Sequence, residues 1–263
     1  MTRPPLGLRS RVLLGAAGVT AVAALAELAA RLGHVDPLLL PPPSSVLAAA
    51  AELPADPEFV LAMYVTSIAC VLGLAAAIAV AVPAGLLLGA LPAAERAIRP
   101  IIEVLRPIPS IALIPLAVFV LGEPHLAKTA LIVYACTWPI LITTLYGMAT
   151  VDPVAVDTLR AFGFGPVAIL RRVCLPSTAP HIATGIRLAL AVALIVSVSA
   201  EVSSGGMTGI GTYIVHTNQA SRSDLMAAAA VAAGLLGWAA TAISTWLERR
   251  LFPWHSYSIG PTS

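Results

Sequence analysis

Charged residues are scarce in this sequence: Asp, Glu, Lys and Arg make up only 11% of its 263 residues, whereas hydrophobic residues make up 59%. Soluble domains carry about 25% charged residues, and a chain this apolar could not hide its surface in one water-soluble core. Aromatic residues are also few, at 5%, while the small residues that let helices pack closely in a membrane are common. The alternating segments of about ten residues that a membrane β-barrel requires are missing. We therefore predict an all-α membrane protein.

Metal-ligand patterns are missing as well. The three cysteines lie far apart without CxxC spacing, and the five histidines form no HExxH pair. These spacings give no support for a disulfide framework or a zinc site. The net charge of +2 is small and gives no indication of nucleic-acid binding. We expect no metal site, no catalytic group and no nucleic-acid partner on this chain.

About six apolar segments are long enough to cross a bilayer, which takes about 20 helical residues. The first could instead be a signal peptide, but its apolar run exceeds the roughly 7–15 residues of a signal core, so we expect an uncleaved helix. The third contains Pro107, Pro109 and Pro115, and so many prolines predict an irregular or broken helix. The six segments are 12–32, 61–91, 101–121, 126–148, 182–202 and 225–247.

Polar and proline-rich stretches separate these segments. Three prolines at 41–43 precede a short helix that Ser44 or Ser45 could cap and that continues through Glu52. Residues 92–99, with the sequence PAAERAIR, form a charged break. We divide the chain into an N-terminus at 1–11, a first span with its proline-rich loop at 12–60, a transmembrane core at 61–250 and a tail at 251–263.

The basic residues predict the orientation. If the N-terminus lies in the cytoplasm, 12 of the 15 basic residues fall on the cytoplasmic side, and only Arg31, Lys128 and Arg222 fall outside. An excess of Lys and Arg in cytoplasmic loops is the usual rule for membrane proteins. We therefore expect six spans with both termini in the cytoplasm.

Residues 149–180, between the fourth and fifth spans, are long for a connection in a compact bundle, and long loops usually have a function. A first short helix begins at Pro153 and is broken by two glycines. A second begins at Pro166 and ends at Leu175 and Pro176. The alternative is a solvated linker, but that would leave aromatic and aliphatic side chains uncovered. We predict a small cytoplasmic helix–turn–helix whose apolar side needs a partner.

This segment resembles the EAA signature of permeases in ABC importers. Asp157-Thr158-Leu159 stands at its acidic start, where the family has Glu-Ala-Ala; Gly163 follows, and Val173-Cys174-Leu175-Pro176 closes the pattern. The sequence from about Pro41 to Trp254 resembles permeases of the nitrate/sulfonate/taurine type. The stretches that carry this wider resemblance are PPPSSV at 41–46, RPIPSIALIPL at 106–116, GIRLAL at 185–190 and AEVSSGGMTGIG at 200–211.

The resemblance implies a type I ABC importer permease in the bacterial inner membrane. Two permease subunits, by default a homodimer although a heterodimer is possible, would form the path, and a soluble extracytoplasmic binding protein would deliver the substrate. The chain has no GxxxxGK[ST] phosphate loop and its only lysine is Lys128, so ATP and Mg are expected on a partner ATPase and no cofactor on this chain. The loop would dock on that ATPase as a coupling helix. Its implied contact residues are Asp157, Arg160, Gly163, Phe164, Pro166, Arg171, Val173, Leu175 and Pro176.

Four further residues are candidates for the translocation path. Pro109 and Pro115 would shape the path at the broken third span. Glu201 lies at the outer end of the fifth span, where an ionisable group usually has a function or a partner; alternatively it simply reaches outside water. Ser197 could line the path, although hydrogen bonding between helices is the more ordinary role for serine in a span.

Other classes of protein remain alternatives at this point. An exporter or another importer subtype fits less well with the spacing of the loop. A membrane-embedded lipid-modifying enzyme would need clustered acids, histidines or metal ligands at the membrane face, and the cytoplasmic acids here lack such spacing. A non-transporting scaffold would not explain the prolines inside the third and fourth spans. The substrate is open, since related permeases move nitrate, sulfonates, taurine, pyrimidine precursors and other small molecules.

Overall fold

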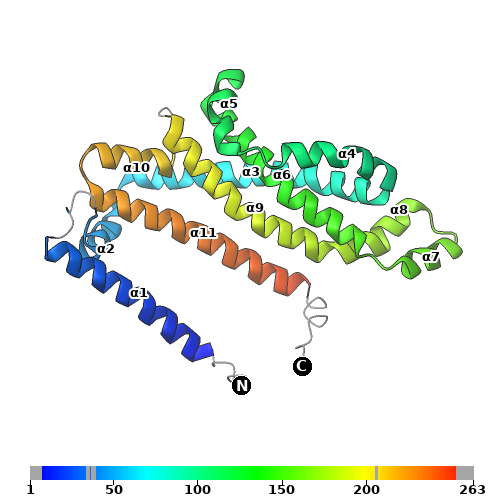
Figure 1. Ribbon diagram of the computed structural model, residues 1–263, viewed down its shortest axis with the longest axis horizontal. Helices are drawn as coiled ribbons and strands as arrows, with labels where there is room; N and C mark the ends of the chain where they lie inside the picture. Colours follow the sequence, from blue (N-terminus) through cyan, green and yellow to red (C-terminus); the bar gives the residue numbers. More distant parts are fainter. Residues whose placement is uncertain (1–7, 34–35, 37–39, 205–206, 253–263) are drawn as a thin grey trace. The chain divides into compact units, whose positions relative to one another are not determined.

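The computed structural model describes residues 8–33, 36, 40–204 and 207–252, and the regular structure in these ranges is helical (Figure 1). Five helices are long and apolar enough to cross a membrane, and a bent pair makes a sixth candidate. Each of the six predicted spans coincides with one of them, which confirms the all-α membrane fold. The long helices are α1 (Leu8–Arg31), α3 (Pro57–Ala90), α6 (Pro124–Ala149), α9 (Leu175–Ser204) and α11 (Ser223–Leu251).

The third span is broken, as its prolines predict. It consists of α4 (Pro92–Leu105), a 3₁₀ turn (Ser110–Leu113) and α5 (Ile114–Leu121), with a bend of 77°. Pro109 is extended (φ −64°, ψ 114°) at the N-cap of the 3₁₀ turn. Pro107 and Pro109 have no backbone N–H to donate to the preceding turn, so α4 cannot continue past them.

The charged stretch at 92–99, which separates two apolar segments, is itself helical. These residues form the first two turns of α4, with Pro92 at the first helical position, where a missing N–H is tolerated. Glu95 and Arg99, four residues apart, form an ion pair of 2.6 Å on the surface of this helix.

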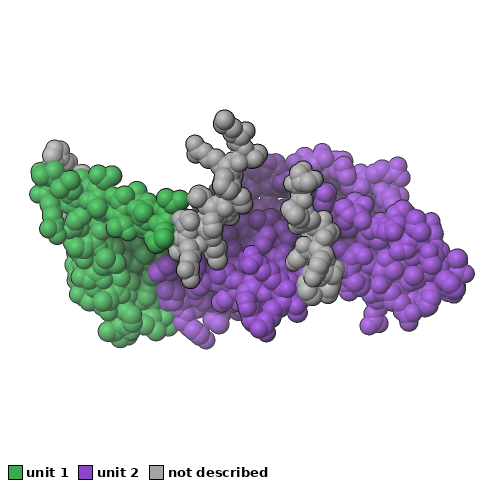
Figure 2. Space-filling view, turned by 90° about the horizontal axis from the view of Figure 1, so that it is seen from below, with its two compact units in different colours: residues 1–61, 213–233 green, residues 62–212, 234–263 purple. Residues whose placement is uncertain are grey.

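The chain divides into two compact units, coloured separately in Figure 2. The first comprises residues 1–61 and 213–233, the second 62–212 and 234–263. In the first unit, Glu27 forms an ion pair of 2.7 Å with Arg31, four residues later in α1. Its carboxylate also accepts hydrogen bonds from the backbone N–H and the hydroxyl of Ser44, at 3.0 and 2.8 Å.

The short helix α2 (Pro43–Glu52) is present, but neither serine caps it. Its N-cap is Pro42, and Pro43 occupies the first helical position. Since the side chain of Ser44 bonds Glu27 and that of Ser45 donates to the carbonyl of Pro42, the predicted capping role was wrong.

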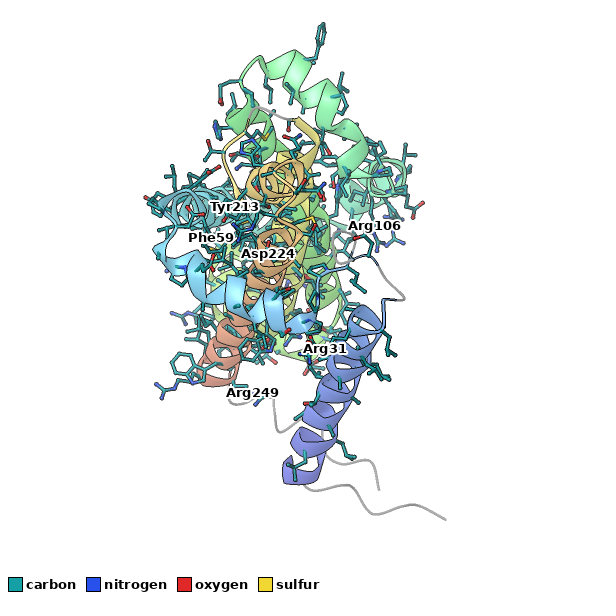
Figure 3. All side chains as sticks on the ribbon, turned by 90° about the vertical axis from the view of Figure 1, so that its left-hand side faces the viewer. Arg31, Phe59, Arg106, Tyr213, Asp224 and Arg249 are labelled. Atoms are coloured by element: carbon teal, nitrogen blue, oxygen red, sulfur yellow. The ribbon has the colours of Figure 1, made fainter. Side chains whose placement is uncertain are left out.

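The first unit also contains a contact between the start of α3 and α10 (Ile210–Gln219). The rings of Phe59 and Tyr213 pack edge to face, with centroids 5.4 Å apart (Figure 3). The hydroxyl of Tyr213 donates to Asp56 at 2.7 Å. This bond lowers the pKa of Asp56, and burial raises the pKa of Tyr213.

The core of the second unit lies where α6 packs along α9, with α3 beside them. Small residues make this packing close. A methyl group added at Gly85 of α3 would come within 2.7 Å of Thr144 of α6, and one at Gly185 of α9 within 2.0 Å of the Thr143 hydroxyl. Glycine at these positions lets neighbouring helices approach closely. Close packing matters here because the hydrophobic effect does not drive helices together inside a membrane.

Candidate functional site

The predicted helix–turn–helix is present between the fourth and fifth spans. Helix α7 (Pro153–Ala161) begins with Asp152 as its N-cap, whose carboxylate accepts from the N–H of Val154 at 2.8 Å. Helix α8 (Pro166–Ile169) begins after Gly165, with Pro166 at its first position. Local sequence accounts for both starts, because an acidic cap and a proline at the first position satisfy or avoid orphan N–H groups.

Gly163 makes the turn between the two helices. Its φ is +78°, a conformation that L-residues with a side chain adopt only at a cost. Its N–H donates to the carbonyl of Arg160, and the N–H of Phe164 donates to the carbonyl of Leu159. This pair of bonds is the Schellman arrangement that ends helices at a left-handed glycine.

The second helix does not end at Leu175 and Pro176, so that prediction was wrong. The chain passes from α8 through a π turn (Leu170–Cys174) directly into α9, and the N–H of Leu175 donates to the carbonyl of Leu170, five residues back. A proline inside an α-helix clashes with the carbonyl four residues earlier. The wider π turn just before Pro176 relieves that clash and lets the helix continue.

The loop presents apolar side chains to its surroundings. Val154, Phe162 and Val167 are 69%, 78% and 68% exposed. The guanidinium of Arg172 lies 4.6 Å from the ring centre of Phe164. Exposed apolar residues grouped in this way are typical of a surface that another protein covers.

The remaining predicted loop residues lie around these side chains. Asp157 and Arg160 form a surface ion pair of 3.0 Å, and Arg171 is exposed. Val173 is half-buried, whereas Leu175 and Pro176 are exposed at the start of α9. The predicted loop residues therefore lie along one continuous segment, formed by α7, α8, the π turn and the first turn of α9.

Glu201 lies at the centre of a buried polar cluster near the end of α9. Its Oε1 accepts hydrogen bonds from the Thr66 hydroxyl at 2.8 Å, the Lys128 ammonium at 2.9 Å and the Ser197 hydroxyl at 3.1 Å. Its Oε2 accepts from the backbone N–H of Gly211 at 2.9 Å. The alternative that Glu201 reaches outside water was wrong, because only 1% of the residue is exposed.

The segment after α9 folds onto this carboxylate. A methyl group at Gly209 would come within 2.1 Å of the Glu201 carboxyl carbon, and the N–H of Ile210 donates to the Thr66 hydroxyl at 2.9 Å. Of the glycine-rich stretch SSGGMTGIG at 203–211, which the sequence predicts to be a turn-rich loop, residues 203 and 204 end α9 and residues 205 and 206 lie outside the described residues. Residues 207–209 are non-helical, and Gly211 belongs to the first turn of α10. Glycine at 209 is required because the carboxylate occupies the space of a side chain.

Sequence reasoning missed the partner of Glu201. Lys128 is the only lysine of the chain and is fully buried in α6. A single ammonium within an apolar helix was a usable signal, since intramembrane charges pair with one another. Ser197 belongs to the same cluster, because its hydroxyl donates to Glu201 one turn later in α9.

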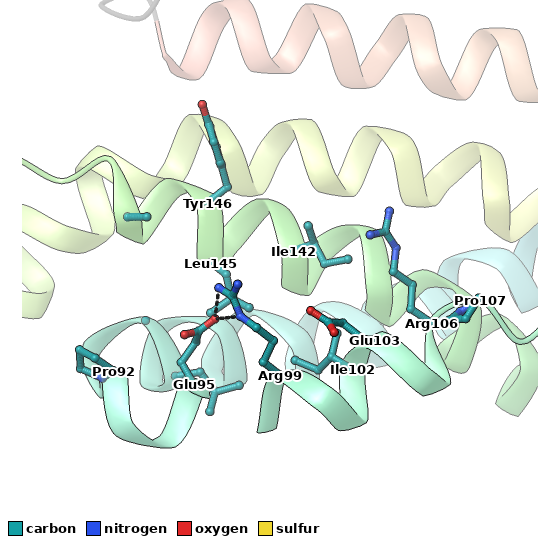
Figure 4. A pocket seen from close by; sticks show the side chains of 13 residues that line it. Pro92, Glu95, Arg99, Ile102, Glu103, Arg106, Pro107, Ile142, Leu145 and Tyr146 are labelled. Carbon is teal, nitrogen blue, oxygen red and sulfur yellow. Dashed lines mark hydrogen bonds and ion pairs between the residues drawn. The ribbon is translucent and has the colours of Figure 1, made fainter. Parts of the chain in front are cut away.

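Two grooves flank the bend of the third span. One, of about 890 Å³, is lined by α4, the end of α3 and the end of α6, and contains the Glu95–Arg99 pair (Figure 4). The other, of about 530 Å³, is lined by the bend itself, by α6 and by α9, and includes Pro109. Pro115 is exposed at the second position of α5. Among the described residues no group of three or more His, Cys, Asp or Glu could hold a metal ion.

These features define a multi-pass α-helical membrane protein with a helical loop between two spans. Residues 81–254 match the family of binding-protein-dependent transport system inner membrane components. The chain is 30% identical over 233 residues to the taurine transport system permease protein TauC of Escherichia coli, covering 86% of this chain and 84% of that protein. It is 28% identical over 169 residues to the nitrate import permease protein NrtB of Leptolyngbya laminosa, covering 64% and 60%.

A solved structure shares the fold. A chain of the MetNI methionine ABC transporter, in an inward-facing conformation, superposes with a TM-score of 0.65 over 73% of this chain and 94% of its own length, at 18% identity. The present chain belongs to the family of binding-protein-dependent transport system inner membrane components. It is a permease subunit of an ABC importer, a transporter component rather than an enzyme.

Proposed function

We propose that two copies of this chain form the translocation path of an importer for a small oxyanion, and that α7 and α8 couple the path to an ATPase in the cytoplasm. An extracytoplasmic binding protein delivers the substrate, and the ATPase binds ATP and Mg. The observation that carries the proposal is the loop at 149–180, with its glycine turn and its exposed apolar side chains.

The substrate class follows from the relatives. TauC is named for taurine, which bears a sulfonate, and NrtB for nitrate. Both groups are small anions whose charge is spread over several oxygens. The family description supports an inner-membrane location. The distribution of basic residues supports an orientation with both termini in the cytoplasm, in which the loop would lie on the side where ATP is found.

The four path residues predicted from the sequence stay predictions. Pro109 has support from its position in the wall of a groove, and Pro115 from its exposure near the bend. Ser197 and Glu201 are buried, and we propose that they support the path by holding the end of α9 in place.

Purification of the full chain in mild detergent from its host tests the coupling role, with ATPase activity assayed on the isolated material. We expect an ATPase to co-purify with the native chain and to be lost when residues 157–176 are scrambled. A sharper variant is Phe162→Asp, because this side chain is 78% exposed and its replacement should not disturb folding. Leu47→Asp is the matched control, since Leu47 is 73% exposed on α2, far from the loop in sequence.

The proposal fails if Phe162→Asp retains the ATPase as fully as Leu47→Asp does. It also fails if the native chain purifies alone from its host.

A further inference from the structure

The smaller groove at the bend of the third span has an unusual set of polar groups. Its wall includes Arg106 and Ser110 from the bend, and Tyr134, Trp138 and Thr143 from α6. Among the residues that the structure describes, no Asp or Glu lines it. Non-helical backbone within a membrane span is tolerated where it lines a cavity, and secondary transporters bind the charged groups of their substrates at such breaks.

Arg106 carries a charge that has no hydrogen-bonded or ion-paired partner among the described residues. Its side chain makes no hydrogen bond or ion pair with any described residue, although it is exposed at the junction of both grooves. Glu95 is already paired with Arg99 in the neighbouring groove, and Glu103 stands nearby without bonding Arg106 (Figure 4). An unpaired guanidinium presents five N–H donors in a planar fork, which matches the oxygens of an oxyanion.

Trp138 adds a second observation. Its indole N–H is buried and has no acceptor among the described residues, although the residue lines the groove. The indole packs edge to face on Tyr134, whose hydroxyl donates to the carbonyl of Leu105 at 2.7 Å. A buried donor without a partner in a native structure calls for an explanation, and an acceptor supplied by a bound anion is one.

We propose that this groove binds a small oxyanion, with Arg106 as the charged ligand and Trp138 as a neighbouring donor. The assignment of that anion as the transported substrate rests on the proposed function. A phosphate of an anionic lipid headgroup shares the same chemistry, so the test must separate the two sources. Donors without a competing carboxylate favour an anion over a cation or a neutral solute.

Tryptophan fluorescence provides a test that does not depend on the ATPase. The full chain is placed in nanodiscs of phosphatidylcholine and titrated with sodium ethanesulfonate, with sodium chloride holding the ionic strength constant. We expect a saturable change that Trp138→Phe abolishes, and no change with dimethyl sulfone, a neutral compound with similar oxygens.

Substitutions of the arginine provide the second arm. We expect Arg106→Gln to weaken ethanesulfonate binding about tenfold or more, because a charge-assisted bond is lost. Arg106→Lys should weaken it less, since it keeps the charge without the fork. Arg99→Gln is the matched control and should leave the affinity unchanged, because Arg99 is paired with Glu95 in the other groove.

Three results would overturn the inference. They are a titration without saturation, an Arg106→Gln variant with native affinity, and a response abolished by adding phosphatidylglycerol to the nanodiscs, which would assign the groove to a lipid phosphate. Because ATPase co-purification does not involve Arg106, a failed titration with a successful pull-down would leave the proposed function intact.

Discussion

The ammonium of Lys128 lies 2.9 Å from the Oε1 of Glu201, and both side chains are fully buried although they are 73 positions apart in the sequence. This pair joins α6 to the end of α9. A buried ion pair contributes little net stability compared with an apolar pair, but removing one partner leaves an uncompensated charge. Its contribution therefore lies in fixing how these two helices meet.

Lys128→Met should lower the free energy of unfolding by about 3–5 kcal/mol, because the Glu201 carboxylate loses its counter-charge. The double variant Lys128→Met with Glu201→Gln should recover most of that loss. Thermal unfolding in detergent measures both. The single variant Glu201→Gln completes the comparison. If the loss in the double variant equalled the sum of the losses in the two single variants, a direct interaction between the pair would be contradicted.

Gly209→Ala should destabilise the same cluster, by about 1–3 kcal/mol, because its methyl group would meet the Glu201 carboxyl carbon at 2.1 Å. Gly234→Ala in α11 is the control, since nothing lies within 4 Å of a methyl group there. This second variant should be neutral or slightly more stable. Equal melting temperatures for the two variants would show that the space beside Glu201 can accommodate a methyl group.

Gly163→Pro should uncouple ATP hydrolysis from transport without preventing membrane insertion. Proline requires a φ near −65° and has no N–H, whereas Gly163 has a φ of +78° and donates to Arg160. The measurement compares ATPase activity and substrate uptake in reconstituted vesicles. Gly165→Ala should behave like the native chain, because Gly165 has a φ of −72° and open space around it. Normal transport by Gly163→Pro would remove the coupling role from this turn.

The bond between Asp56 and Tyr213 predicts a pH dependence. It lowers the pKa of Asp56, so the stability it contributes is complete above about pH 4 and is lost as the pH falls through the lowered pKa. Burial and this bond raise the pKa of Tyr213, so the stability contributed by its proton is present below about pH 10 and is lost as the pH rises through the raised pKa.

Tyr213→Phe tests this dependence while keeping the ring against Phe59. The substitution should lower the free energy of unfolding by about 1 kcal/mol at neutral pH. The variant should then lose less stability than the native chain does on acidification. Melting temperatures across the acid range measure the difference. Tyr64→Phe is the control, because Tyr64 is 63% exposed. Identical acid profiles for Tyr213→Phe and the native chain would exclude the Asp56 contribution.

Much of the fold was predictable because its signals are local. An apolar run of about 20 residues predicts a span wherever it occurs. The broken third span follows from prolines that remove backbone donors, and the loop turn from a glycine between two proline-led helices. The continuation past Pro176 was not predictable in this way, because a π turn absorbs a clash that ordinarily ends a helix.

The polar sites depend on distant parts of the chain. Glu201 was recognised as a functional candidate, but its pairing with Lys128 and Thr66 requires α3, α6 and α9 to be packed together. Likewise, Arg106 became notable only when the bend placed it in the wall of the same groove as Trp138, which no described carboxylate lines.

The sequence by itself determined that this chain lies in a membrane, where its spans run, where the third span breaks and which loop resembles a coupling helix. These properties follow from composition, periodicity and the backbone limits of proline and glycine. The tertiary structure alone decided which polar groups neutralise each other and which remain unpaired. The physical reason is that hydrogen bonds and ion pairs form between side chains that packing brings within about 3 Å, whatever their separation in sequence.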